Sequence, residues 1–125
     1  MDFLWVGIGG GAGAIMRYGL GKQIARLWGT AFPYSTLVIN LTGAFIIGIL
    51  LTVLTERTLT DPLWRLLLVT GFLGGYTTFS SYTYEAMQLF EDGRWGAGLL
   101  YIGGSNGVGL LCCAAGMAIA RNTLV

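Results

Sequence analysis

The sequence has 125 residues, of which 54% are hydrophobic and only 10% are charged, and its formal net charge is +1. An ordinary soluble domain has about 25% charged residues, and a small protein needs many polar side chains to cover its surface. The composition therefore excludes a soluble globular domain, a disordered tail and a nucleic-acid-binding protein, and it indicates a small integral membrane protein.

Apolar segments predict four membrane-spanning helices. A helix that crosses a bilayer needs about 20 mostly apolar residues. Such segments cover residues 3–21, 34–55, 63–90 and 95–120, and the third has a polar interruption near residues 74–79. The sequence therefore predicts an all-α membrane protein that forms a single four-helix transmembrane domain over residues 1–125.

The first predicted span is rich in glycine. Small residues four positions apart, such as Gly7 with Gly11 and Gly9 with Gly13, favour close packing of helices. The same spacing occurs at positions 44 and 48 and at positions 103 and 107. Arg17 lies near the end of this span, where its side chain either extends to the membrane surface or attracts anions into a vestibule.

Asn40 lies in the middle of the second predicted span, within the segment LVINLTG of residues 37–43. A buried amide has donors and an acceptor that need partners. Two interpretations remain open. The amide either joins neighbouring helices by hydrogen bonds or lines a polar path through the membrane.

The third span contains the most informative segment, GFLGGYTTFSSY at residues 71–82. Adjacent glycines followed by hydroxyl residues are poor helix formers, so we expect a break here. Backbone outside a helix is tolerated in a membrane only when it is buried in protein or lines a wet cavity. Free carbonyl oxygens at the break would suit a hard cation, and two copies meeting there could share one ion. A simple kink stabilised by Ser and Thr is the alternative.

Two further features lie after this segment. Phe79 and Tyr82 are three residues apart and are expected on one helix face. Aromatic ring edges are electropositive, so they would pass an anion without trapping it, although packing in a core is the alternative. Glu85 is the one acidic residue that we place well inside a span, as a proton-coupled group or as a residue near a wet vestibule.

Residues in the fourth span recur every four positions. Tyr101, Ser105 and Gly109 are predicted to form one stripe, which either offers hydroxyl donors or packs against a neighbouring helix. Cys112 and Cys113 are adjacent, which disfavours a disulfide between them, so we interpret them as small apolar packing residues.

Basic residues are divided almost evenly between the two predicted membrane surfaces. Arg57, Arg65 and Arg121 are expected on the side of the termini, and Lys22, Arg26 and Arg94 on the other. This balance gives no strong instruction about orientation under the positive-inside rule. Either another signal sets the orientation, or the chain inserts both ways. Insertion both ways would allow an antiparallel homodimer, which has the symmetry of transporters with inverted repeats.

Several motifs, in this order, resemble those of the Fluc (CrcB) fluoride channel family over essentially the whole chain. GGGAGAIMRY at residues 9–18 is similar to the GGxxGAxxRY pattern, and TLVINLTG at residues 36–43 is similar to TLxVNxxG. GFLGGYTTFS at residues 71–80 resembles the GFxGGxTTFS signature and is the most specific match. The stripe of Tyr101, Ser105 and Gly109 also matches the family, whereas Tyr82 stands where the family usually has a second Phe.

The resemblance implies a multi-pass protein of the inner (plasma) membrane that is not an enzyme. It implies an antiparallel, dual-topology homodimer that passively exports fluoride from the cytoplasm through two pores and so relieves fluoride toxicity. It implies pore-lining roles for Asn40, Phe79, Ser80, Tyr82, Tyr101 and Ser105.

The resemblance also implies a vestibule position for Arg17. Glu85 matches an acidic position after the signature, without an assigned role. A structural Na⁺ is expected at the dimer centre, held by the backbone carbonyls of Gly74 and Thr77 from both copies.

The main alternative is a dual-topology exporter of the small multidrug resistance type. Such proteins have a similar length, but they carry a Glu in the first span for exchange of protons and cations. Here the first span has only Asp2, at its start, and Glu85 in the third span is the one substitute. A non-transporting assembly subunit is a further alternative, but it leaves Asn40 and the segment at residues 74–81 without a purpose.

Overall fold

The computed structural model describes residues 1–56 and 61–125, and this part of the chain is almost entirely helical, without strands. Its elements are α1 (Asp2–Trp28), α2 (Tyr34–Glu56), α3 (Pro62–Trp64), η1 (Arg65–Leu73), α4 (Gly74–Tyr76), α5 (Phe79–Glu91), α6 (Trp95–Gly103), η2 (Gly104–Val108) and α7 (Gly109–Thr123). The segments η1 and η2 are π-helical and continue into the neighbouring α-helices.

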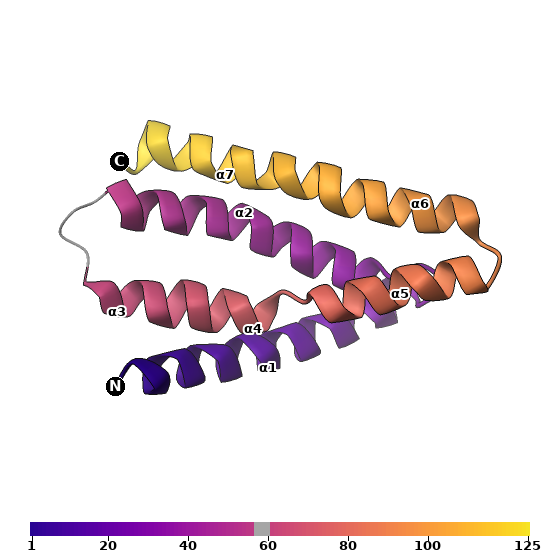
Figure 1. Ribbon diagram of the computed structural model, residues 1–125, viewed down its shortest axis with the longest axis horizontal. Coiled ribbons are helices and arrows are strands. Elements are labelled where there is room, and N and C mark those ends of the chain that lie inside the picture. Colours follow the sequence, from indigo (N-terminus) through magenta and orange to yellow (C-terminus); the bar gives the residue numbers. More distant parts are fainter. Residues whose placement is uncertain (57–60) are drawn as a thin grey trace.

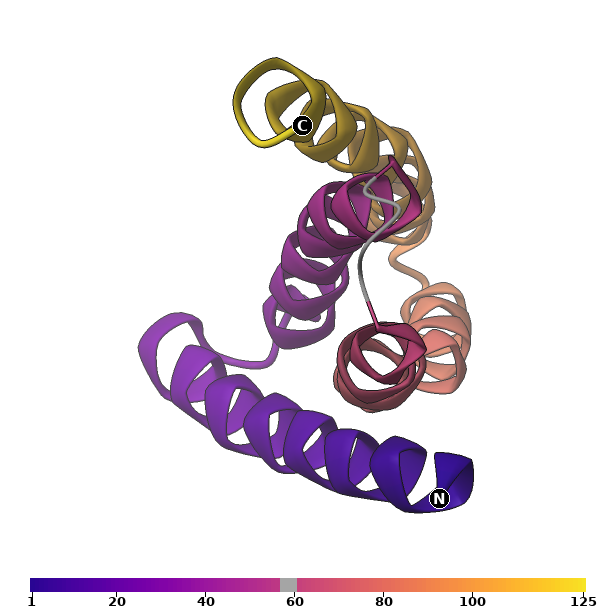
Figure 2. The ribbon, with the colours of Figure 1, turned by 90° about the vertical axis from the view of Figure 1, so that its left-hand side faces the viewer.

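The helices run along the length of the molecule, and the two termini lie at the same end (Figure 1). Viewed from that end, α2 lies in the middle, with α7 on one side and α1 with η1 on the other (Figure 2). The helix α2 packs against α7, and α1 packs against η1 and α4. Because α2 is central, it contacts both the third helical row, which runs from α3 to α5, and the fourth helical row, which runs from α6 to α7.

The first helix is longer than the apolar span at residues 3–21, because it continues to Trp28. Hydropathy marks the end of the apolar stretch before Lys22, but helix formation does not require apolar residues. The helix ends at Gly29, which has φ 77°, and the Gly29 N–H donates to the Ala25 carbonyl at 2.8 Å. Only glycine adopts this left-handed conformation without strain, so Gly29 gives α1 its stop.

Glycines allow α1 to lie directly against the backbone of the third helical row. A methyl group on Gly9 would overlap the carbonyl oxygen of Leu67, and one on Gly13 would overlap that of Phe72. The second glycine pair of α1, Gly7 and Gly11, has no such close neighbour, since a methyl group added to either residue would meet nothing within 4 Å. The two glycine pairs of α1 therefore have separate roles, one inside the chain and one on its outer face.

Close backbone approach also joins α2 to α7. A methyl group on Gly48 would overlap the carbonyl oxygen of Cys113, and one on Gly116 would overlap that of Phe45. Cys113 thus lies in the α2–α7 interface, and both Cys112 and Cys113 are free thiols.

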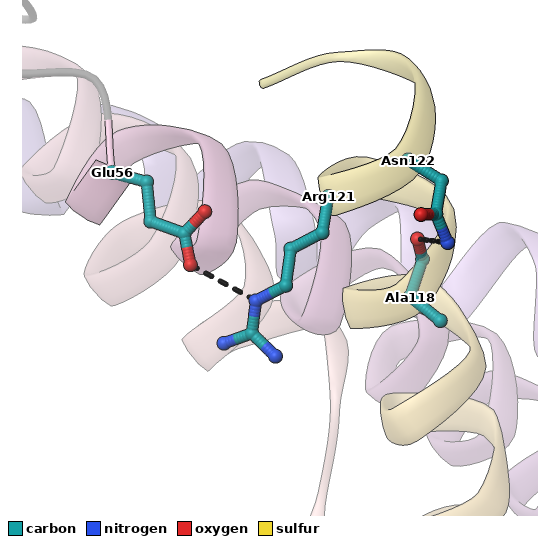
Figure 3. Close-up of polar contacts among 4 residues, drawn as sticks. All are labelled: Glu56, Ala118, Arg121 and Asn122. Atoms are coloured by element: carbon teal, nitrogen blue, oxygen red, sulfur yellow. Dashed lines mark hydrogen bonds and ion pairs between the residues drawn. The ribbon is translucent and has the colours of Figure 1, made fainter.

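Polar side chains connect the helices at the end where the termini lie. The Arg121 Nε donates to Glu56 Oε1 at 2.9 Å and so joins α7 to α2 (Figure 3). The Arg65 guanidinium donates to Thr55 Oγ1 at 2.9 Å. The Glu56–Arg121 ion pair is largely exposed, and such pairs contribute about 0–1 kcal/mol, so it orients the helix ends more than it stabilises them.

Two continuous helices in the described ranges are long and apolar enough to cross a membrane, namely Tyr34–Glu56 and Trp95–Thr123. The row from α3 to α5 is interrupted, and α1 combines apolar turns with a basic final turn. Arg57, which the sequence analysis assigned to one membrane surface, lies outside the described residues. The structure is thus that of an all-helical protein with membrane-capable helices.

A Gly9→Ala substitution should destabilise the protein by about 1–3 kcal/mol, because the new methyl group overlaps backbone that cannot move independently. Gly7→Ala is the matched control, and it should be neutral or slightly stabilising since Ala favours helix. Thermal unfolding of the two purified variants in detergent measures the difference. Equal stability of both variants would contradict the close packing of α1 against η1.

Candidate functional site

The third helical row is broken at Thr77 and Thr78. The helix α4 ends at Tyr76, Thr77 has ψ 158°, and Thr78 is extended with φ −147° and ψ 119°. The helix α5 then begins at Phe79, and the Thr78 side chain accepts a hydrogen bond from the Ser81 N–H at 3.2 Å, which is a regular N-cap. The interruption is thus a break between two helices, with extended backbone and a capped restart.

Asn40 of α2 binds the backbone at this break. Its Nδ2 donates to the Thr78 carbonyl at 3.0 Å, and its Oδ1 accepts from the Thr78 N–H at 2.9 Å. The Thr78 N–H has no partner in the helices on either side, so the Asn40 oxygen satisfies it. The Thr78 carbonyl, which as the N-cap carbonyl also accepts the first hydrogen bond of α5, receives a second donor from Asn40. An unsatisfied backbone group costs several kcal/mol in a membrane, so the hydrogen bond to the Thr78 N–H is what allows an extended residue here.

The same geometry frees carbonyl oxygens just before the break. A helix would direct the Thr78 N–H to the carbonyl of Gly74, but that N–H donates to Asn40 instead. Gly74 is exposed and lines an open pocket of about 420 Å³ together with Thr77, Asn40 and Phe79. Neutral carbonyl oxygens on an exposed face are ligands that suit a hard cation such as Na⁺, so these residues fit such an ion. Within residues 1–56 and 61–125 no cluster of Cys, Asp and Glu side chains forms a second candidate metal site.

Arg17 of α1 also contacts the broken segment. Its Nε donates to the Gly75 carbonyl at 3.0 Å. The positively charged side chain of Arg17 therefore points toward the third helical row. The sequence predicts Arg17 at a vestibule or at the membrane surface, but it contains no signal for this bond because Gly75 is 58 positions away.

A pocket of about 230 Å³ with two basic side chains in its lining extends from Arg17 to the break. It is lined by Arg17, Tyr18, Gly21, Lys22, Ser35, Thr36, Ile39, Thr78 and Ser81. Two cationic side chains stand in this pocket, and the hydroxyl groups lead on to the capped start of α5. Such an arrangement attracts an anion by its charge and offers it the Ser81 hydroxyl as a neutral donor near the helix break.

Aromatic rings continue from the break along α5. Phe79 is 76% exposed, whereas Tyr82 is 8% exposed and Tyr101 is fully buried. The ring centroids lie 5.8 Å apart for Phe79 and Tyr82 and 5.2 Å apart for Tyr82 and Tyr101, with tilted or edge-to-face geometry. The three residues predicted from the sequence therefore form one continuous aromatic series.

Hydroxyl groups lie beside the start of this series. Thr78 Oγ1 is 3.4 Å from Ser80 Oγ and donates to Ser81 Oγ at 3.2 Å. Ser80 is exposed, and Ser81 is partly buried. Ser105 is partly exposed in η2, where the widened helical turn departs from the four-residue stripe expected from the sequence.

Glu85 lies where α5 meets α6. The Tyr101 hydroxyl donates to Glu85 Oε1 at 3.3 Å, and Glu85 also lines a polar pocket of about 270 Å³ with Gln88, Asp92 and Arg94. Sequence reasoning left the role of Glu85 open. In the structure this carboxylate is at the edge of the aromatic series, next to a polar pocket at the far end of the bundle from the termini.

The family model described as CrcB-like protein, Camphor Resistance (CrcB), matches residues 4–117. The chain belongs to the CrcB family. It is 49% identical over 114 residues to a protein of Koribacter versatilis named fluoride-specific ion channel FluC. The aligned residues make up 91% of this chain and 88% of that protein. Proteins with the same name from Acidobacterium capsulatum (45% identical, 97% of both chains) and Rhizobium etli (44% identical, 94% of both chains) are also similar.

One feature of this CrcB protein was missed from the sequence. The Tyr82 hydroxyl, which the usual family Phe would lack, donates to Asn106 Oδ1 at 3.5 Å. Asn106 is an exposed amide in η2, next to Ser105 and within a mostly apolar helical stretch. A polar residue at that depth is itself a signal for function, and it could have been found in the sequence on this ground.

An Asn40→Ala substitution in this CrcB protein should be destabilising, because it leaves the Thr78 N–H without a partner, at a cost of about 1–3 kcal/mol, and removes the second donor to the Thr78 carbonyl. Thermal unfolding and the monodisperse fraction in size-exclusion chromatography measure this loss. Asn122→Ala is the matched control, since that amide binds only the Ala118 carbonyl on an exposed turn (Figure 3). Similar stability of both variants would show that Asn40 does not hold the break.

Proposed function

We propose that this CrcB protein is a fluoride-selective channel that conducts fluoride passively across the cell membrane and catalyses no reaction. The observation that carries the proposal is the pocket with two cationic side chains that ends at the break held by Asn40. The similar proteins from Koribacter versatilis and Acidobacterium capsulatum, which are named fluoride-specific ion channels, support it. In the cell, such a channel relieves fluoride toxicity by export from the cytoplasm.

The chemistry of the pocket suits fluoride. Fluoride is small and strongly hydrated, so an anion path needs several close donors in place of water. The Ser81 hydroxyl provides a neutral donor, while Arg17 and Lys22 raise the local anion concentration. An ion must also leave for conduction to occur, and the donors beyond the pocket are uncharged.

The aromatic series is the proposed continuation of the path. Phe79 and Tyr82 would present electropositive ring edges, with Tyr101 and Ser105 further along the fourth row. Asn40 and Ser80 complete the proposed pore lining. The second N–H of the Asn40 amide is not needed for Thr78, so this residue could both hold the break and donate to an anion.

The proposed working unit is an antiparallel, dual-topology homodimer in the inner membrane, in which each chain crosses the bilayer four times. The exposure of Phe79 and the open pocket beside Gly74 support a second copy, because one chain leaves these parts of the site uncovered. The nearly even division of basic residues supports insertion in both orientations. Two copies would form two pores.

The proposed cation at the dimer centre is Na⁺. The backbone carbonyls of Gly74 and Thr77 from both copies would hold it, for which the freed carbonyl of Gly74 and the open pocket give room. A bound cation would supply fixed positive charge between the copies. Asn40, Arg17 and the N-cap of Thr78 would keep the backbone at the break in place.

Liposomes loaded with fluoride test this function. The reconstituted protein should release fluoride far faster than chloride without a proton gradient, which a fluoride electrode measures. Efflux that requires a pH gradient would instead support the exporter of the small multidrug resistance type, which no comparison supports.

Phe79→Ala should reduce the fluoride efflux rate by at least tenfold while leaving the dimer intact, because the exposed ring is proposed to line the path. Tyr84→Phe is the control, since Tyr84 is 66% exposed on the same helix and is outside the proposed pore. Wild-type flux in the Phe79 variant would exclude the ring from the pore.

Labelling of single cysteines tests dual topology. In a background with Cys112 and Cys113 replaced, a cysteine near either terminus should react with a membrane-impermeant reagent from both sides of sealed membranes. Labelling from one side alone would contradict the antiparallel dimer.

A further inference from the structure

We call the two hydrogen bonds between the Asn40 amide and the Thr78 backbone the Asn40 clamp. A second connection between α2 and the break lies next to it. Tyr76 is the last residue of α4 and is 5% exposed, and its hydroxyl lies 2.9 Å from Thr42 Oγ1. Thr42 Oγ1 lies 2.8 Å from the Val38 carbonyl and 3.0 Å from the Ile39 carbonyl. Because the single hydroxyl proton of Thr42 goes to the backbone, the Tyr76 hydroxyl is the donor to Thr42. We call this chain of hydrogen bonds the Tyr76–Thr42 relay.

The Tyr76–Thr42 relay and the Asn40 clamp fix the residues before and after Thr77. Asn40 binds Thr78, and Thr42 binds Tyr76, so Thr77 lies between two fixed neighbours. Packing restricts Thr77 further, since a methyl group on Gly43 of α2 would overlap Thr77 Cγ2. The Thr77 N–H and hydroxyl both donate to the Leu73 carbonyl, at 3.0 and 2.9 Å. The direction of the Thr77 carbonyl is therefore set by its two fixed neighbours, by its own bonds to Leu73 and by its contact with α2.

We propose that Tyr76 and Thr42 are positioning residues that fix the carbonyls of Gly74 and Thr77 and thereby set the affinity of the channel for sodium. This inference rests on the sodium site of the proposed function. Tyr76 is suited to the role because its hydroxyl is separable from its packing. The Tyr76 ring stacks on Phe72 with centroids 5.9 Å apart, and it packs with Ile39 and Leu73 in a buried cluster. Removal of the hydroxyl alone therefore releases the carbonyls without opening a cavity.

Sodium titration of the purified full-length chain tests the inference. The thermal unfolding midpoint is followed as NaCl replaces N-methyl-D-glucamine chloride at constant ionic strength. For Tyr76→Phe and for Thr42→Val, half-maximal stabilisation should need about 3–10-fold more sodium than for the wild type, which corresponds to the loss of one neutral hydrogen bond. Tyr84→Phe removes a hydroxyl from an exposed site and should leave the sodium midpoint unchanged.

The double variant Thr42→Val with Tyr76→Phe tests whether the two residues act together. Its sodium midpoint should equal that of either single variant, because both substitutions break the same relay. Shifts that add in the double variant would overturn the relay. If Tyr76→Phe yields no folded protein, Thr42→Val alone decides the sodium midpoint.

The remaining outcomes separate this inference from the function on which it rests. A loss of stability that is equal with and without sodium would overturn the positioning role, because it would show that the relay only stabilises the fold. A wild-type protein whose unfolding does not respond to sodium would overturn both the sodium site and the relay's role. A wild-type response with unshifted variants would overturn only the inference, and fluoride efflux measured in parallel would leave the channel function standing.

Discussion

The structure depends on the pair of hydrogen bonds between the Asn40 amide and the backbone of Thr78. An extended residue inside a membrane helix leaves an N–H group that lipid cannot satisfy. The Asn40 amide accepts from this N–H through its oxygen and donates to the carbonyl of the same residue through its nitrogen, whereas an ionised carboxylate could only accept. The amide therefore decides that the third helical row can be broken, and it places the break beside α2.

The break has a different chemical character on each of its sides. The groups after it are hydroxyls and a capped helix start, next to the pocket of Arg17 and Lys22, and they suit an anion. The groups before it are carbonyls on the open pocket of Gly74, and they suit a cation. Because one short segment separates these surfaces, anything that moves the segment changes both. The glycine-mediated packing of α1 on η1 limits such movement.

Much of this arrangement could be predicted from the sequence, and the limits have physical causes. Two adjacent glycines and two threonines predict the break because they are poor helix formers, and the apolar spans predict the helices. The partners of Asn40 and Arg17 could not be predicted, because they are 38 and 58 positions away and depend on how helices pack. The π-helical turns of η2 also escaped prediction, since a four-residue spacing presumes a regular α-helix.

Under the proposed dual topology, the basic side chains at the two ends of the bundle would have an evolutionary consequence. Arg65 and Arg121 bond to Thr55 and Glu56 near the termini, while Arg94 bonds to the Ala31 carbonyl between α1 and α2 at the other end. In a chain that inserts both ways, every substitution is presented to both sides of the membrane. One additional cation at either end would favour one orientation and leave half of the required partners missing. Sequence drift at these ends would then be limited by the need to keep two populations equal, even at positions remote from the ion path.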